Sequence, residues 1–203
     1  MFIMRTRFLV AGTIALVVAF AGTFAAFHLT RGQSSRPPPL PVLSDLGGEF
    51  ELASAGGRVR LQDYRGRVVL LFFGYTYCPD VCPTSLHTLK LAVDTLGTEA
   101  DRVQVIMITI DPERDSAQHL ARYMRYFHPQ FMGLSGTTDE VERVARQYRV
   151  FHEKVPISPG GYLVNHSGYF YLLDSRGRVR ALFGAGAKPM TIADGVRQLL
   201  REN

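Results

Sequence analysis

The sequence predicts an α/β domain: a mixed β-sheet with helices on both faces and an N-terminal β-hairpin extension, preceded by one transmembrane helix. Two continuous apolar runs, Val68–Phe73 and Val103–Ile110, are typical of strands buried on both faces. Amphipathic helical segments follow them, and an antiparallel strand pair precedes the last helix, which favours a mixed sheet. With 203 residues, 46% hydrophobic and 20% charged, the chain is long enough for one such domain plus extensions.

The N-terminal segment predicts a membrane anchor. Phe8–Phe27 contains neither charge nor proline, and at about 1.5 Å per helical residue it covers roughly the 30 Å of a bilayer's hydrocarbon core. Arg5 and Arg7 precede it, so the positive-inside bias places the N-terminus in the cytoplasm and the domain outside. A cleaved secretory signal is the alternative, because Ala19-Phe20-Ala21 has the form of a cleavage site. Either segment exports the domain.

A proline-rich tether follows the anchor. Pro37-Pro38-Pro39 and Pro41 favour a semi-rigid polyproline segment of about 3 Å per residue. We therefore divide the chain into a cytoplasmic N-terminus with its transmembrane anchor (residues 1–30), a tether (31–44) and a folded domain (45–203). We expect a single-pass protein of the bacterial inner membrane, with the C-terminal domain in the periplasm.

The charge of the chain does not indicate a nucleic-acid partner. The net charge is +5 and the sequence pI is about 9.4. However, Lys and Arg are scattered along the sequence and form no basic run. An exported domain also rarely meets nucleic acid, so we expect a solvated basic surface.

The elements of the domain follow in order. Apolar residues alternate on either side of Gly56-Gly57, which predicts a short β-hairpin. The helices predicted from apolar spacing and caps cover Leu86–Leu96, ended by Gly97, then Ala117–Phe127, a segment capped by Thr137 and Glu140, and a segment from Thr191. Tyr169–Leu173 and Val179–Phe183 flank a glycine-bearing turn and predict an antiparallel strand pair. This order is that of the thioredoxin fold, with an added N-terminal hairpin and an inserted helix.

The only two cysteines, Cys78 and Cys82, lie where the first core strand leads into its helix. Pro83 suits the first turn of a helix, so we expect Cys82 at or just before the helix N-terminus and Cys78 on the preceding loop. Both thiols then face the positive end of the helix dipole, which favours the thiolate form. A thiolate is both a nucleophile and a metal ligand.

Three interpretations of this pair remain open. A buried, inert pair is the simplest, because free cysteine is often buried. A catalytic dithiol is the second, although its usual spacing is C-x-x-C and this is C-x-x-x-C. The third is a soft-metal site, since two thiolates select Cu(I), zinc or an iron–sulfur centre. Two ligands are too few for structural zinc, whereas a third would complete a three-coordinate copper site.

The histidines are candidates for that third ligand. A solvated or interfacial role suffices for His28, His87, His119, His128 and His152. His166 differs, because it immediately precedes the strand Tyr169–Leu173, and in a thioredoxin-like fold the segment entering this strand packs against the dithiol. Its imidazole would then lie beside two thiolates. A solvated loop histidine is the alternative.

Three motifs stand in order along the chain: Phe73–Pro83, which contains Cys-Pro-Asp-Val-Cys-Pro, then Asp111-Pro112-Glu113-Arg114-Asp115, and Tyr162-Leu163-Val164-Asn165-His166-Ser167. Together they resemble the Sco/SenC family, whose members are membrane-anchored, thioredoxin-like copper proteins of respiratory oxidase assembly. The similarity runs from about Gly47 to the C-terminus, with the motifs in the family's order.

The resemblance implies a ligand set and a cargo. Cys78, Cys82 and His166 match the family's copper ligands, which implies binding of Cu(I) and Cu(II). It also implies delivery of copper to the binuclear copper centre of cytochrome c oxidase subunit II. Asp111 matches an acidic position near the metal loop and is a secondary candidate, although aspartate before proline is also an ordinary turn former. Asn165 stands where the family usually has aspartate, and we expect a different copper affinity or redox behaviour if that carboxylate is the partner of the imidazole.

The leading hypothesis is therefore a copper metallochaperone, a transfer protein and not an enzyme. Copper would arrive on a periplasmic donor protein and leave by ligand exchange. Because Cu(I) loading requires reduced cysteines, a thiol reductant of thioredoxin type is an expected partner. The alternative is a thiol–disulfide oxidoreductase that reduces the acceptor's cysteines and does not need His166. A peroxiredoxin-like peroxidase is a more distant alternative.

Overall fold

The computed structural model describes residues 20–25, 37–157 and 159–202. The chain divides into two compact units, Met1–Pro38 and Pro39–Asn203. In the first unit, residues 20–25 are helical. Within the described ranges, no helix has the length and apolar character needed to cross a membrane. The expected anchor, Phe8–Phe27, lies mostly outside these ranges, as does the first part of the tether.

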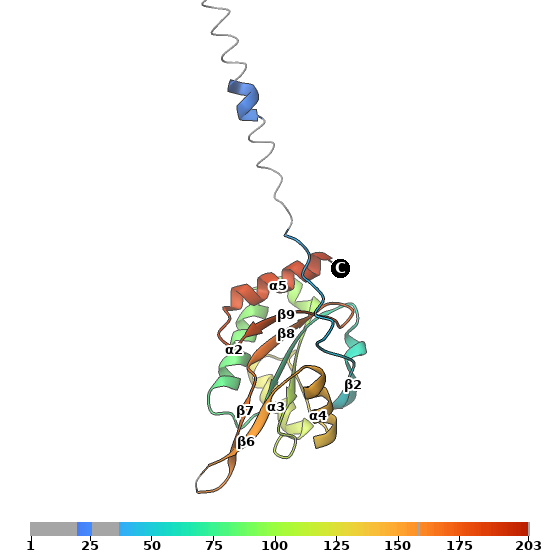
Figure 1. Cartoon of the computed structure of the whole chain (residues 1–203), viewed down its shortest axis with the longest axis vertical. Helices are drawn as coiled ribbons and strands as arrows, with labels where there is room; N and C mark the ends of the chain where they lie inside the picture. Colours follow the sequence, from blue (N-terminus) through green and yellow to red (C-terminus); the bar gives the residue numbers. More distant parts are fainter. Residues whose placement is uncertain (1–19, 26–36, 158, 203) are drawn as a thin grey trace, which may run out of the picture. The chain divides into compact units, whose positions relative to one another are not determined.

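The second unit is built on a five-stranded mixed sheet with the strand order β5-β4-β3-β8-β9 (Figure 1). Its strands are β3 (Val68–Gly74), β4 (Val103–Thr109), β5 (Met132–Leu134), β8 (Tyr169–Leu173) and β9 (Val179–Gly184). The pairs β3–β4 and β4–β5 are parallel, whereas β8 runs antiparallel to both β3 and β9. The predicted mixed sheet is confirmed.

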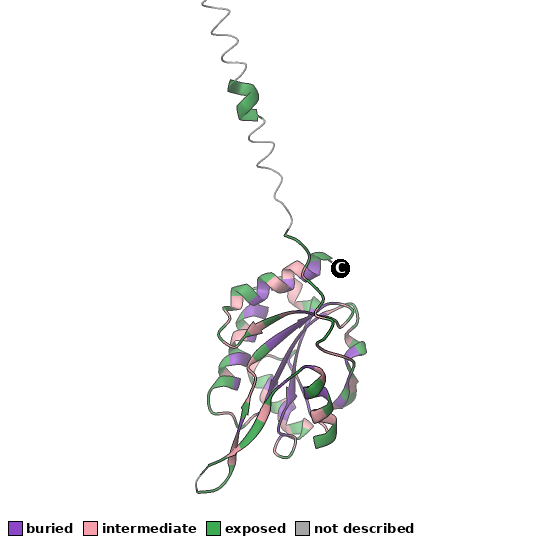
Figure 2. Cartoon of the chain, viewed as in Figure 1, coloured by how far each residue is buried: buried purple, intermediate pink, exposed green. Residues whose placement is uncertain are grey.

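Four α-helices and two 3-10 helices are described in this unit. They are α2 (Val81–Asp94), α3 (Ala117–Phe127), α4 (Thr138–Gln147), α5 (Pro189–Glu202), η1 (Leu61–Tyr64) and η2 (Gly97–Arg102). Helices α2 and α5 pack against each other, and α3 packs against β5. Every residue of β3 and β4 is buried, so both faces of the central sheet are covered (Figure 2). Continuous apolar runs at these two strands follow from that burial.

Local sequence signals place most helix ends. Thr137 and Glu140 form the predicted capping box at α4. Helix α5 begins at Pro189 and not at Thr191, because proline is well suited to the first helical position. Helix α2 ends at Asp94, and Gly97 begins η2 instead of ending α2.

Two small hairpins extend the sheet core. The predicted one pairs β1 (Glu51–Ser54) with β2 (Gly57–Arg60). The second pairs β6 (His152–Pro156) with β7 (Tyr162–His166) and was not predicted. It projects from the domain in Figure 1. Because most of its side chains are exposed or half-buried, its sequence lacks a regular apolar alternation.

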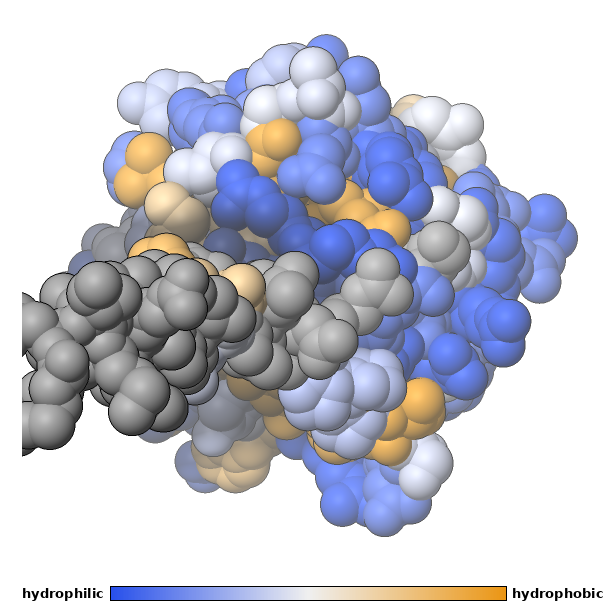
Figure 3. All heavy atoms as spheres, turned by 90° about the horizontal axis from the view of Figure 1, so that it is seen from above, coloured by the Kyte–Doolittle hydropathy of each residue, from blue (hydrophilic) through white to orange (hydrophobic). Residues whose placement is uncertain are grey.

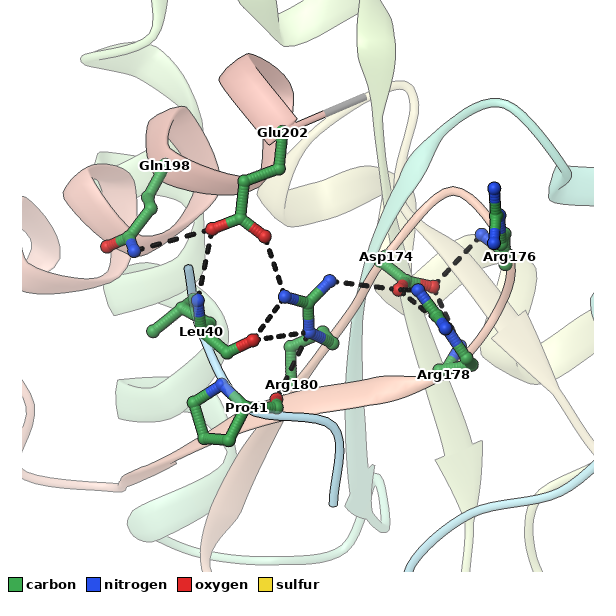
Figure 4. Close-up of polar contacts among 8 residues, drawn as sticks. All are labelled: Leu40, Pro41, Asp174, Arg176, Arg178, Arg180, Gln198 and Glu202. Atoms are coloured by element: carbon green, nitrogen blue, oxygen red, sulfur yellow. Dashed lines mark hydrogen bonds and ion pairs between the residues drawn. The ribbon is translucent and has the colours of Figure 1, made fainter. Parts of the chain in front are cut away.

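The start of the folded unit is fixed by a buried arginine. Arg180 donates hydrogen bonds to the carbonyl oxygens of Leu40 and Pro41 and forms ion pairs with Asp174, at 3.1 Å, and Glu202, at 2.6 Å (Figure 4). Leu40, Leu43 and Leu46 also pack against the core. Ordered contacts therefore begin before Asp45, the position where the sequence led us to expect the domain to start.

The Arg180 cluster lies at one end of the sheet, and the cysteines lie at the other. Val69, near the start of β3, pairs with Leu173, directly before Asp174. Strand β3 then runs the length of the sheet toward Cys78.

The view in Figure 3 shows predominantly hydrophilic residues with small, separate apolar areas on the face drawn there.

Candidate metal centre

The two cysteines lie where β3 leads into α2. Cys78 is on the connecting loop and half-buried, and Cys82 is the second residue of α2 and fully buried. The helix thus begins one residue earlier than expected, and Cys82 lies inside its first turn together with Pro83. The backbone N–H of Cys82 points to Cys78 Sγ at 3.4 Å, as expected for a sulfur at a helix N-terminus.

His166, the last residue of β7, completes the group. Its Nε2 lies 3.4 Å from Cys82 Sγ. The ligand atoms of Cys78, Cys82 and His166 all lie within 4.8 Å of one another, which forms a Cys-Cys-His group that could hold a metal ion. In the part of the chain that the structure describes, no other cluster of three such residues meets this criterion. The sequence placed His166 on a loop, whereas the structure places it at a strand end.

A backbone contact sets the tautomer of His166. Its Nδ1 lies 3.1 Å from the carbonyl oxygen of Ser167. A carbonyl can only accept, so the proton is on Nδ1 and the lone pair is on Nε2, the nitrogen that faces the sulfurs. The phenyl ring of Phe72 and the ring of Tyr75 pack edge-on against the imidazole, with centroids 6.2 and 6.0 Å away. The nitrogen suited to metal binding is therefore presented to the thiols.

The group opens onto a pocket of about 360 Å³. Its lining includes Tyr75, Cys78, Pro79, Asp80, Leu163 and His166. Cys82 is absent from this lining and fully buried. An incoming ligand would therefore meet Cys78 and His166 first.

The two thiols differ in acidity. A hydrogen bond from the Cys82 thiol, opposed by burial, lowers the pKa of Cys78 to about 3. The hydrogen bond to Cys78, together with burial, raises the pKa of Cys82. In the metal-free protein the first negative charge is thus on Cys78 and the shared proton is on Cys82. A metal ion would displace that proton, because both sulfurs bind metal as thiolates.

Asp111, the secondary candidate, lies outside the Cys-Cys-His group. It is fully buried, and its two carboxylate oxygens accept hydrogen bonds from Arg114 Nε and from the Tyr162 hydroxyl. Its structural partners are therefore an arginine and a tyrosine. Arg114 and Tyr75 are site residues that the sequence did not single out, and the available signal was their position within the motifs Asp111–Asp115 and Phe73–Pro83.

The other described histidines lie elsewhere. His119 Nε2 is 3.0 Å from Thr76 Oγ1, and its ring stacks on Tyr77. His152 pairs with Glu142 at 3.3 Å, and His87 is exposed on α2. None of them joins the thiols.

Asn165 is exposed and lies directly across the hairpin from Glu153. The imidazole is oriented by the hydrogen bond that its Nδ1–H donates to the Ser167 carbonyl oxygen. Asparagine at position 165 therefore leaves this orienting contact in place.

Comparison with known proteins gives a consistent family. The SCO1/SenC family profile matches residues 40–201. The mitochondrial Protein SCO2 homolog of Bos taurus is 36% identical over 200 residues, covering 96% of this chain and 75% of the relative. The structure of Bradyrhizobium japonicum ScoI with copper bound is 38% identical, with a TM-score of 0.70, and covers 76% of this chain and 99% of that chain.

A more distant structure, of BsSco, shares the fold. It is 24% identical, with a TM-score of 0.63 over 81% of this chain and 98% of that chain. BsSco is described as a member of the Sco family of cytochrome c oxidase assembly proteins. The Bradyrhizobium japonicum structure contains copper, and the present chain has a Cys-Cys-His group that could hold a metal ion.

Proposed function

This chain belongs to the SCO1/SenC family, and on that premise we propose that it is a copper metallochaperone in which Cys78, Cys82 and His166 hold the ion. The observation that carries the proposal is the convergence of two sulfurs and one imidazole nitrogen within 4.8 Å. Thiolate sulfur and imidazole nitrogen are the ligand types that suit Cu(I) and Cu(II). Copper is the cargo of the protein, so binding and release are its function.

The geometry supports transfer by ligand exchange. Three protein ligands leave copper with room for another, and the pocket beside Cys78 and His166 admits it. Buried Cys82 would release copper last, after the more accessible ligands have been replaced. A thiolate of the acceptor can thus enter before the ion is free in solution.

The wider setting extends the proposal. The acceptor is the binuclear copper centre of cytochrome c oxidase subunit II, and the cargo comes from a periplasmic donor protein. Residues 1–30 anchor the chain once in a bacterial inner membrane, and the folded domain carries the site in the periplasm. The expected tether, residues 31–44, ends at about Pro39, because Leu40 and Leu43 already pack against the domain. A thiol reductant of thioredoxin type keeps Cys78 and Cys82 ready for Cu(I).

The asymmetry of the two thiols favours a second candidate function. An accessible thiolate at Cys78 beside a buried thiol at Cys82 is suited to forming and then resolving a mixed disulfide. The protein would then reduce the acceptor's cysteines as a thiol–disulfide oxidoreductase. This role needs both cysteines but not His166.

Anaerobic Cu(I) titration of the reduced full-length chain, against a competing chelator, tests the chaperone. We expect one tightly held copper in the wild type and much weaker binding in Cys78→Ser. Equal binding by the two proteins would contradict the proposal. Full rescue of oxidase assembly by His166→Ala in cells that lack this protein would favour the oxidoreductase instead.

A further inference from the structure

We propose that Arg114 is a positioning residue that holds the β6–β7 hairpin, and with it His166, over the cysteines. The affinity for Cu(II) then depends on Arg114 more than the affinity for Cu(I) does. The inference deepens the proposed function and rests on it. Arg114 lies in the turn after β4 and belongs to neither ligand-bearing segment. It contacts both of them.

The first set of contacts is to the β6–β7 hairpin. Arg114 Nη1 donates to the carbonyl oxygen of Tyr162 at 3.0 Å, and the guanidinium carbon lies 3.7 Å from the centroid of the Tyr162 ring. A cation this close to an aromatic face is attracted to it. Tyr162 begins β7, and His166 ends it. A restraint on Tyr162 is therefore transmitted along one short strand to the imidazole.

The second set of contacts is to the segment that carries Cys78. The Arg114 guanidinium carbon lies 4.8 Å from the centroid of Tyr77 and 5.8 Å from that of Tyr75. The Tyr75 hydroxyl accepts a hydrogen bond from the Val164 N–H at 3.1 Å. Tyr75 also packs edge-on against His166. The cysteine loop and the histidine strand thus meet around one guanidinium.

Asp111 fixes the arginine in this place. The carboxylate is fully buried and ion-paired to Arg114 Nε, and its other oxygen accepts from the Tyr162 hydroxyl at 2.8 Å. Among the residues that the structure describes, none accepts a hydrogen bond from Arg114 Nη2, although that atom is buried. The guanidinium is therefore held by Asp111, the Tyr162 carbonyl and three aromatic rings. These contacts fix the orientation of the guanidinium but do not satisfy all of its N–H donors.

The adjoining residue, Asp115, secures the cysteine loop independently. Its carboxylate accepts hydrogen bonds from the Thr76 backbone N–H at 3.0 Å and from Thr109 Oγ1 at 2.7 Å. Loss of Arg114 should therefore free the hairpin more than the cysteines. Two thiolates suffice to hold Cu(I), whereas Cu(II) has a stronger need for the imidazole nitrogen. Loss of Arg114 should therefore lower the affinity for Cu(II) more than the affinity for Cu(I).

The test compares full-length Arg114→Met and Arg114→Lys with wild type and with Arg125→Met, which removes an exposed cation on α3. Cu(I) and Cu(II) affinities are measured by chelator competition, and the Cu(II) site is observed by electron paramagnetic resonance and by its thiolate charge-transfer bands. We expect Arg114→Met to weaken Cu(II) binding about 10- to 100-fold, the usual range for partners that orient a ligand. Cu(I) affinity should stay at the wild-type value, the Cu(II) spectra should change, and Arg114→Lys should fall between.

Tyr162→Phe is the second variant, because it keeps the ring and removes only the hydroxyl that binds Asp111. It should shift the Cu(II) spectrum in the same direction as Arg114→Met, by a smaller amount. Equal losses of both oxidation states, or unchanged Cu(II) binding and spectra in all three variants, would overturn the inference while leaving the chaperone in place. A wild-type chain that holds neither ion would overturn the proposed function and this inference with it.

Discussion

Cys82 Sγ and His166 Nε2 lie 3.4 Å apart, although 84 positions separate them in the sequence. The pairing of β3 with β8 brings them together, because Phe72 lies directly opposite Phe170. From that pair, the chain runs forward to Cys82 and backward to His166. The core strands thus determine which residues meet at the site.

The acidity of Cys78 predicts its reactivity. Hydrogen bonding from the Cys82 thiol lowers the pKa of Cys78 to about 3, so this sulfur is already a thiolate at neutral pH. An ordinary thiol, with a pKa of about 8.5, reacts faster as the pH rises toward that value. Iodoacetamide should therefore modify Cys78 at a rate that is flat between about pH 5 and 8, with Cys82 protected by burial. Mass spectrometry of the reduced, metal-free chain measures both rates.

The same labelling in urea supplies the control for this prediction. There both cysteines should react, each with the pH dependence of an ordinary thiol. A Cys78 rate in the folded protein that climbs tenfold per pH unit would contradict the assignment of the thiolate.

Gly74, the last residue of β3, leaves no room for a side chain. A Cβ there would lie 2.7 Å from Phe72 Cε1 and 3.0 Å from Cys82 Sγ. Gly74→Ala should therefore displace the sulfur, weaken copper binding and destabilise the fold by about 1–3 kcal/mol. Gly184→Ala is the matched control, since no atom lies within 4 Å of its added Cβ. Copper affinity and the free energy of unfolding in urea are measured for both variants. Wild-type values of both quantities in Gly74→Ala would refute the packing described.

Asp174 predicts a loss of stability in acid. Burial opposes its ionisation, but hydrogen bonds from Arg178 and Arg180 prevail and lower the pKa of Asp174 (Figure 4). Since the folded pKa lies below the unfolded value of about 3.9, the stabilisation is complete above that pH and is lost as the pH falls through the folded pKa.

The measurement is urea unfolding at pH 6 and near pH 3. Asp174→Asn should lower the free energy of unfolding by about 1–3 kcal/mol at pH 6, because it removes one of the two carboxylates that pair with buried Arg180 and leaves it with Glu202. The variant should lose less stability than wild type on acidification. Asp194→Asn, at an exposed position, should behave as wild type does. Parallel acid losses in wild type and Asp174→Asn would contradict this role.

Asn165 lies opposite Glu153, so Asn165→Asp would place two carboxylates face to face across the hairpin. We expect this repulsion to weaken the hairpin by about 0.2–1 kcal/mol and to disappear in the Glu153→Gln background. Hydrogen exchange of the β6–β7 amides measures the effect in a double-mutant cycle. An equal effect in both backgrounds would show that the repulsion is not its cause.

Local patterns in the sequence were sufficient for much of the fold. The buried strands β3 and β4 appear as apolar runs, and the capping box at Thr137 marks the start of α4. The spacing of Cys78 and Cys82 at the start of a helix favoured the candidate metal centre as one of three interpretations. In each case the signal lies within a few residues of the feature that it predicts.

The missed features depend on residues distant in sequence. Strand β5 has only three residues, and β6 is mostly exposed, so neither carries an apolar period. The role of Arg114 arises because the turn after β4, the cysteine loop and β7 converge in space. No local pattern reports such a convergence.

Copper K-edge X-ray absorption of the loaded full-length chain tests the central claim most directly. Coordination by Cys78, Cys82 and His166 predicts two sulfur ligands and one imidazole nitrogen. The nitrogen should be lost in His166→Ala and kept in His119→Ala, whose imidazole contacts Thr76 instead. An imidazole nitrogen that persists in His166→Ala, or an all-sulfur site in the wild type, would contradict the account.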